Sequence, residues 1–252
     1  MATPTDLQRF ERDFRERELD FAGDARVRHE RRVEFDAVVR RARARPGLRV
    51  LDAGCGIGRI SEALARRGAQ VTALDFAHAR LRALEARIPG GVNLVQGDVT
   101  RLPLARESFD LIVSTQVIEH VPEEGARRAL LAAFQRLLRP DGRVLLTAYN
   151  YSLPWQRRGG AREGLHNTGI FYHCYTAREL KGELQTAGFT VREVCGLIHL
   201  WPHTYRMLPR LGALGRGLDH CGEHFARQGE RWGHLLLAQA TISNGFGATQ
   251  TS

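Results

Sequence analysis

The chain has 252 residues, of which 43% are hydrophobic and 26% are charged, a composition typical of a folded globular protein with one domain. This proportion of hydrophobic residues excludes a wholly disordered chain. No apolar run reaches the roughly 18 residues of a membrane-spanning helix. The formal net charge of +9 is spread along the chain rather than concentrated on one element, so we do not expect a nucleic-acid-binding protein.

The segment 6–43 combines charges of alternating sign with spaced apolar anchors, a pattern that indicates helices. Gly23 is expected to separate two helices, and Pro46 and Gly47 end the segment. We interpret residues 1–47 as a helical lid over a ligand site. An arm that only packs against the core is the alternative.

The segment 48–149 alternates short apolar runs with helical patterns. Alternating strands and helices are typical of a mostly parallel sheet with helices on both faces, which is a Rossmann-like α/β core. We predict strands at 48–52, 71–74, 92–95, 109–114 and 143–149, and helices at 60–67, 78–88 and 126–138.

The segment 150–252 completes the same domain with a predicted helix at 176–187 and strands at 190–195 and 234–242. Two irregular insertions, 150–175 and 197–233, contain all three tryptophans and are expected on the substrate side. An insertion as long as 197–233 is uncommon without a purpose. A cap over the substrate and a contact between copies in a homodimer are the two interpretations that we retain.

A glycine-rich loop, VLDAGCGIG, follows the first strand of the core and opens a helix. Alternating glycines allow a tight turn and close approach to a ligand, although a dinucleotide fingerprint has the different spacing GxGxxG. Asp75 ends the second strand and Asp98 follows the third, where carboxylates can accept from a ribose and from an exocyclic amine. These positions predict an adenosine site at the carboxyl ends of the strands.

Five motifs occur in order: VLDAGCGIG, VTALD, QGDVTRLP, FDLIVSTQVIEHV and LLRPDGRVLLT. With them the sequence resembles the class I S-adenosylmethionine-dependent methyltransferases, and among these the small-molecule enzymes similar to the ubiquinone-pathway O-methyltransferase. The resemblance covers about 48–149, the segment TARELKGELQTAGFTVREV and the last strand. It implies S-adenosylmethionine as cofactor, S-adenosylhomocysteine as product, and a seven-stranded sheet with an antiparallel last strand. An NAD(P) enzyme is the rival that the glycine spacing and the Asp98–Val99 pair disfavour.

The resemblance also implies roles for individual residues. The glycine loop lines the methionine moiety, Asp75 binds the ribose, and Phe76 lies beside the adenine, which Asp98 and Val99 hold. Thr115 and Gln116 face the methionine end. The cofactor-binding residues that we expect are Asp52, Gly54, Cys55, Gly56, Asp75, Phe76, Asp98, Val99, Thr115 and Gln116.

His120 is the candidate catalytic base, because it follows the fourth strand at the end where the methyl group is expected and histidine titrates near neutral pH. A packing signature of the Glu119–His120 pair is the alternative. Some relatives read Glu-x-x-Glu-His here, a motif linked to a divalent cation, whereas this chain has Gln116 at the first position. An amide is a poorer ligand for Mg²⁺, so we do not expect a divalent metal there.

Two further histidine pairs, His199 with His203 and His220 with His224, have the i, i+4 spacing that suits zinc on a helix. Pro202 and Gly222 interrupt the two pairs, so we do not expect zinc there either.

The insertion 150–175 and the strand before it supply aromatic, histidine and asparagine side chains beside the expected transfer site. Such side chains suit a flat, partly polar acceptor such as a phenol or heterocycle. The candidate substrate-binding residues are Tyr149, Asn150, His166 and His173.

We therefore expect in-line SN2 transfer of a methyl group to an oxygen or nitrogen of a small aromatic or heterocyclic metabolite. The alternatives are an RNA or protein methyltransferase and a non-catalytic cofactor-binding partner subunit. Contact of tryptophan- and arginine-bearing stretches with a membrane surface is a further reading, but a cap folded onto the core is favoured. The four cysteines form no CxxC pair and the first residues lack the apolar region of a secretory signal, so we expect a cytoplasmic protein.

Overall fold

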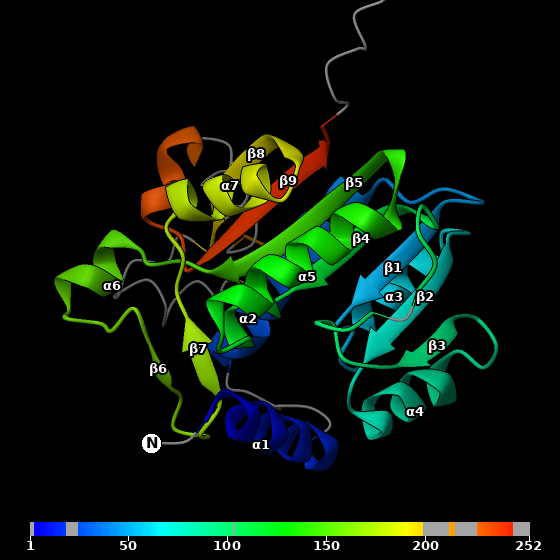
Figure 1. The fold of residues 1–252 in the computed structure, drawn as a ribbon, viewed down its shortest axis with the longest axis horizontal. Helices are drawn as coiled ribbons and strands as arrows, with labels where there is room; N and C mark the ends of the chain where they lie inside the picture. The colour runs from blue at the N-terminus through cyan, green and yellow to red at the C-terminus, as the bar shows by residue number, and fades with distance from the viewer. Residues whose placement is uncertain (1–2, 19–24, 103, 199–211, 215–225, 244–252) are drawn as a thin grey trace, which may run out of the picture.

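The computed structural model describes residues 3–18, 25–102, 104–198, 212–214 and 226–243. A seven-stranded sheet runs through them in the order β3-β2-β1-β4-β5-β9-β8. Only β9 is antiparallel to its neighbours β5 and β8, so the predicted fold class is confirmed (Figure 1). The strands are β1 (Arg49–Ala53), β2 (Gln70–Asp75), β3 (Asn93–Gln96), β4 (Phe109–Thr115), β5 (Leu138–Tyr149), β8 (Phe189–Leu197) and β9 (Leu235–Ile242).

Helices cover both faces of the sheet because each strand presents apolar side chains on both sides. Leu51 of β1 belongs to an apolar cluster with helical side chains from 130–137 and 180–184, whereas its neighbour Val50 belongs to a second cluster with helical side chains from 33–42, 60–64 and 84. The described helices are α1 (Pro4–Arg17), α2 (Ala25–Ala42), α3 (Arg59–Ala65), α4 (His78–Arg87), α5 (Glu124–Leu137), α6 (Leu153–Arg157) and α7 (Ala177–Thr186), with short 3₁₀ turns η1 (Ile118–His120) and η4 (Ala226–Arg231).

Each strand and helix predicted within 48–149 is present, with ends shifted by a few residues. The largest shift is in β5, which begins at Leu138 rather than at 143. Leu138 pairs with Phe109 of β4, and the register then shifts before Arg143 pairs with Leu111. The strand therefore begins early because Leu138 pairs with a neighbouring strand. The hydrophobic pattern of a single segment does not reveal such a pairing.

The insertion 150–175 is more ordered than the sequence indicated. It contains α6 and a hairpin of two short strands, β6 (Glu163–Leu165) and β7 (Phe171–His173). Strands of three residues are too short to produce a recognisable periodicity. Most of the insertion 197–233, with both of its histidine pairs, and Gly23 in the N-terminal segment lie outside the described residues.

None of the helices that the structure describes is both long and apolar enough to cross a membrane. Cys55, Cys174 and Cys195 are free thiols.

We predict that Gly58→Ala destabilises the fold more than Gly47→Ala. Both glycines have a left-handed φ, +75° and +79°, so both substitutions carry the same backbone cost. At Gly58 the added Cβ would lie 2.4 Å from Cδ2 of the buried Leu84, whereas at Gly47 it would meet open space. Overpacking should add about 1–3 kcal/mol to the loss at Gly58. Urea unfolding of both variants measures the difference, and equal losses would show that contact with Leu84 is unimportant.

Candidate functional site

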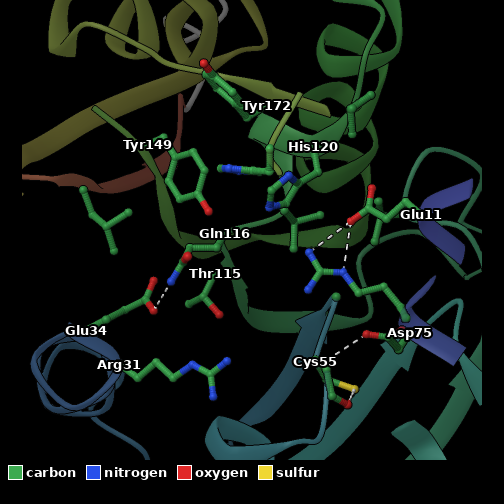
Figure 2. A pocket seen from close by; sticks show the side chains of 18 of the residues that line it. Glu11, Arg31, Glu34, Cys55, Asp75, Thr115, Gln116, His120, Tyr149 and Tyr172 are labelled. Atoms are coloured by element: carbon green, nitrogen blue, oxygen red, sulfur yellow. Dashed lines mark hydrogen bonds and ion pairs between the residues drawn. The ribbon is translucent and has the colours of Figure 1, made fainter. Parts of the chain in front are cut away.

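A cavity of about 930 Å³ lies at the carboxyl ends of β1, β2, β4 and β5, where α1, α2 and the β6–β7 hairpin complete its wall (Figure 2). This volume is within the range of small-molecule sites. Parallel strands end at one edge of a sheet, which is why residues from distant motifs meet there. The sequence-predicted residues that line it are Asp52, Gly54, Cys55, Gly56, Asp75, Phe76, Asp98, Val99, Thr115, Gln116, His120, Tyr149, Asn150 and His166.

His173 does not line the cavity. Its Nδ1 lies 3.2 Å from a carboxylate oxygen of Glu163, and its ring packs edge-on against Tyr175. Successive side chains of a strand point to opposite sides, so β7 directs the neighbouring Tyr172 into the cavity instead.

The glycine loop is fixed between two strand ends. The backbone N–H groups of Gly54 and Cys55 both donate to the carbonyl of Leu74, at 2.8 and 2.9 Å. A Cβ on Gly54 would lie 2.4 Å from Val117 Cγ2, so the segment after β4 packs directly on the loop. Only a residue without a side chain fits between these two segments.

Asp75 closes the other side of this loop. Its carboxylate oxygens accept from the N–H groups of Gly56 and Ala77, at 2.8 and 2.9 Å, and each oxygen can accept a further bond. Burial raises the pKa of Asp75, and the two backbone donors oppose that shift. The arrangement leaves a carboxylate of fixed orientation at the cavity wall, next to Phe76.

Asp52 lies behind the loop and is almost completely buried. The Ser61 hydroxyl donates to it at 2.6 Å. Burial raises the pKa of Asp52 to about 6, and the nearby charge of Asp75 adds to the shift.

Asp98 is held in the same way after β3. One of its carboxylate oxygens accepts from both the backbone N–H and the hydroxyl of Thr100, at 2.8 and 2.7 Å. The second oxygen forms no hydrogen bond within the described part of the chain. The guanidinium of Arg12 from α1 lies 6.0 Å from the centre of the Phe76 ring, so α1 covers this end of the cavity.

Helix α1 contacts both sides of the cavity. Arg80 of α4 donates to the carbonyls of Arg15 and Glu18, and Glu16 accepts from the N–H of Ala79. At the other side, a Cβ on Gly169 between β6 and β7 would lie 2.8 Å from the Phe10 ring, so the two are in direct contact. The N-terminal segment thus bridges α4 and the hairpin.

His120 stands in the turn η1 and points into the cavity (Figure 2). Its Nδ1 lies 2.8 Å from the carbonyl oxygen of Phe171. A carbonyl only accepts, so Nδ1 carries the proton and Nε2 keeps a lone pair. Burial lowers the pKa of His120 to about 4, and the positive charge of Arg15 contributes, so the ring is neutral at neutral pH.

Aromatic and imidazole rings form the wall around His120. The ring centres of His120 and Tyr149 are 5.6 Å apart, those of Tyr149 and His166 are also 5.6 Å apart, and those of His166 and Tyr172 are 4.7 Å apart. Burial lowers the pKa of His166 to about 4 and raises that of Tyr149. The rings meet edge to face or at a tilt, so the wall presents both ring edges and ring faces, and its imidazole rings are neutral at neutral pH.

Asn150 also lines the cavity, but its amide nitrogen is engaged elsewhere. It donates to the carbonyls of Glu230 and Gly233, at 2.6 and 2.7 Å. These bonds fix the chain that leads into β9.

Sequence reasoning missed charged cavity residues contributed by the N-terminal helices, among them Glu11, Arg15, Arg31 and Glu34. Glu34 is buried and accepts from Gln116 Nε2 at 2.6 Å (Figure 2). It also accepts from the Thr147 hydroxyl at 2.6 Å. Burial raises the pKa of Glu34, and these hydrogen bonds oppose the shift.

A signal for Glu34 was present in the sequence. It precedes the buried Ala37 and Val38 by three and four residues, so it interrupts the apolar stripe of α2. A lone acidic residue on an apolar helix face is expected to accept a hydrogen bond from a donor that is buried beside it.

Glu119 is completely buried, and neither of its carboxylate oxygens has a hydrogen-bond partner in the described residues. Burial raises its pKa well above the ordinary value, because the charged form loses its hydration there. No group of three or more metal-binding side chains is present within the described ranges. The Gln116 amide donates to Glu34, whereas a carboxylate at position 116 would face another carboxylate. The expectation that no divalent metal binds stays a prediction.

Comparison with known proteins identifies a family. Residues 27–194 match the family described as a methyltransferase domain. The ubiquinone biosynthesis O-methyltransferase of Xanthomonas campestris pv. campestris (strain B100) is 34% identical over 199 residues, covering 71% of this chain and 77% of that protein. The protein with the same name from Pseudomonas entomophila (strain L48) is 35% identical over 191 residues, covering 69% and 75%.

The fold is shared with solved structures at lower identity. The crystal structure of Burkholderia thailandensis 1,6-didemethyltoxoflavin-N1-methyltransferase, with bound 1,6-didemethyltoxoflavin and S-adenosylhomocysteine, has a TM-score of 0.63 and 22% identity. The match covers 97% of this chain and 92% of that one.

We predict that Asp52→Asn raises the free energy of unfolding above pH 7. The pKa of Asp52 is about 6 in the folded protein and about 3.9 in an unfolded chain, so folding favours the protonated form. Its contribution to stability is complete below pH ~4 and is lost as the pH rises through 6. Asparagine does not titrate and can still accept from Ser61. The gain should be near zero below pH ~4 and about 2 kcal/mol at pH 7.5. Urea unfolding at both pH values measures it, and a variant less stable at pH 7.5 contradicts the assignment.

Proposed function

The chain belongs to the methyltransferase-domain family and is an S-adenosylmethionine-dependent methyltransferase, and we propose that it methylates an oxygen or nitrogen of a small aromatic or heterocyclic metabolite. One observation carries the proposal. A single cavity joins the residues expected to bind the adenosine to a wall of neutral imidazole and phenol rings.

The cavity residues fit the cofactor. Asp75 has spare acceptor capacity for the ribose hydroxyls, and Asp98 has a second carboxylate oxygen for the adenine amine. Gly54 and Gly56 bring the backbone close to the methionine moiety, and Thr115 and Gln116 border its far end. When bound, S-adenosylmethionine supplies a methyl group on a positively charged sulfur, which needs alignment more than further activation.

The remaining chemical requirement is removal of the acceptor's proton. Nε2 of His120 has the free lone pair, and its ring is held by the bond from Nδ1 to Phe171. In the proposed step it accepts the proton of an acceptor hydroxyl while that oxygen bonds to the methyl carbon, the bond from this carbon to sulfur breaks, and S-adenosylhomocysteine is left. The pKa of about 4 makes His120 a weaker base than a free histidine, so its position rather than its basicity supports this role. For an amine acceptor, the same nitrogen accepts the proton from the methylated product.

The acceptor wall favours a planar ring. Tyr149, His166 and Tyr172 provide edges and faces for stacking, and Trp155 also lines the cavity. The two N-terminal helices cover the cavity, and we propose that residues 1–47 act as a lid that excludes water. The relatives' names include an O-methyltransferase of ubiquinone biosynthesis and an N1-methyltransferase of a heterocycle, which supports a ring acceptor without choosing the atom.

Label transfer tests the function directly. The purified protein is incubated with methyl-labelled S-adenosylmethionine and an extract of its source cells, and the labelled products are separated by size. We expect the label in a small, organic-extractable fraction, where mass spectrometry identifies the methylated atom. Label in RNA or protein would contradict a small-molecule acceptor.

We predict that His120→Asn lowers kcat by about 100-fold while the affinity for S-adenosylhomocysteine stays near that of the wild type. The asparagine amide still donates to the Phe171 carbonyl but has no group in place of Nε2. The variant therefore keeps the loop and removes the base. Steady-state kinetics with the identified acceptor and calorimetry with S-adenosylhomocysteine measure both effects.

His173→Asn is the matched control, because this histidine lies outside the cavity and should leave kcat unchanged. An unchanged kcat in His120→Asn would show that His120 only shapes the loop.

A further inference from the structure

Glu34 connects an N-terminal helix to the end of the central strands. It lies on α2, 82 residues from Gln116 and 113 from Thr147, and it is buried between them. Its two carboxylate oxygens accept one hydrogen bond each, from the Thr147 hydroxyl and from Gln116 Nε2, both at 2.6 Å. A buried carboxylate with both oxygens paired holds its partners firmly.

Gln116 has two hydrogen-bond donors, its backbone N–H and its side-chain Nε2, and both donate within this network. Its backbone N–H donates to Thr147 Oγ1 at 3.0 Å, and the Thr147 hydroxyl passes its own hydrogen to Glu34. Gln116 has a left-handed φ of +51°, a conformation that a residue with a side chain rarely adopts. These hydrogen bonds therefore hold Gln116 in a conformation that it would not otherwise prefer.

Glu34 also decides which end of the Gln116 amide faces the cavity. An acceptor-only carboxylate must face Nε2, because the amide oxygen would be repelled. Oε1 is then the remaining polar atom of the side chain, and it forms no hydrogen bond within the residues that the structure describes. Gln116 lines the cavity between Thr115 and Tyr149 (Figure 2).

We propose that Glu34 is a positioning residue for the amino-acid end of the cofactor. It fixes the Gln116 amide so that Oε1 accepts a hydrogen bond from the α-ammonium group of the methionine moiety. The inference rests on the proposed function, since it takes the methionine end of the cofactor to lie at Thr115 and Gln116. Because Glu34 is carried by α2, the same contact links docking of that helix to the shape of the cofactor site.

Two ligands separate this role from a general loss of structure. S-adenosylhomocysteine has the amino-acid end, whereas 5′-methylthioadenosine has the same adenosine and sulfur without it. Glu34→Leu removes both acceptors and frees the Gln116 amide to rotate. Calorimetry should show S-adenosylhomocysteine binding about tenfold more weakly, with the affinity for 5′-methylthioadenosine unchanged.

A double-mutant cycle tests whether Glu34 acts through Gln116. In a Gln116→Leu background, Glu34→Leu should cause no further loss of S-adenosylhomocysteine affinity. Asp36→Leu is the matched control, because Asp36 lies on α2, pairs with Arg32 and does not line the cavity, so both affinities should stay at the wild-type values. If Glu34→Leu does not fold, Glu34→Gln replaces it and should weaken S-adenosylhomocysteine binding selectively.

Three results would overturn the inference: unchanged S-adenosylhomocysteine affinity, equal loss for both ligands, or additive losses in the cycle. Failure of the proposed function looks different. In that case the label would appear in RNA or protein, while the wild-type protein would still bind both ligands.

Discussion

A carboxylate that is removed from water needs hydrogen-bond donors, and this requirement organises the carboxyl edge of the sheet. Asp75 takes its donors from the glycine loop and from the start of α4. Asp52 takes a hydroxyl from α3, and Glu34 takes donors from β5 and from the segment after β4. Each of these buried acids thereby fixes a different segment at the edge of the cavity. The glycines allow the loops to pass close to one another, and the hydrogen bonds to the acids fix the positions of the loops.

Glu119 is the exception, because its buried carboxyl group lacks the hydrogen-bond donors that the other buried acids have within the described residues. It is as deeply buried as the others, yet no donor reaches it within the described residues, and its pKa is correspondingly far above the ordinary value. Burial therefore disfavours a negative charge at this position, next to His120 and Tyr149. The imidazole rings of the wall that faces the proposed acceptor are uncharged for the same reason, since burial also keeps both histidines in the neutral form. Most of the buried acids lie on the cofactor side of the cavity, whereas Glu11, which pairs with Arg15, lines it near His166.

Local pattern was sufficient for the core of the fold. The strands from β1 to β5 read as apolar runs because both faces of the sheet are covered, and the glycine loop and Asp75 stand at positions that strand ends dictate. The hairpin was missed because three-residue strands carry no period. The same hairpin explains the placement of His173, since the pleat of β7 turns Tyr172 inward and its neighbour away. Glu34 was missed because its partners are far away in the chain, although its position on an apolar stripe was visible. The local pattern of apolar and polar residues does not predict contacts between segments that are distant in the sequence.

The position of α1 affects how ligands can exchange. One end of this helix is tied to α4, beside the proposed adenosine site, and Phe10 rests on the turn of the hairpin that forms the acceptor wall. A movement of α1 that uncovers one compartment therefore loosens the other. If α1 moves as part of the lid that we propose, exchange of the acceptor and exchange of the cofactor would depend on the same movement.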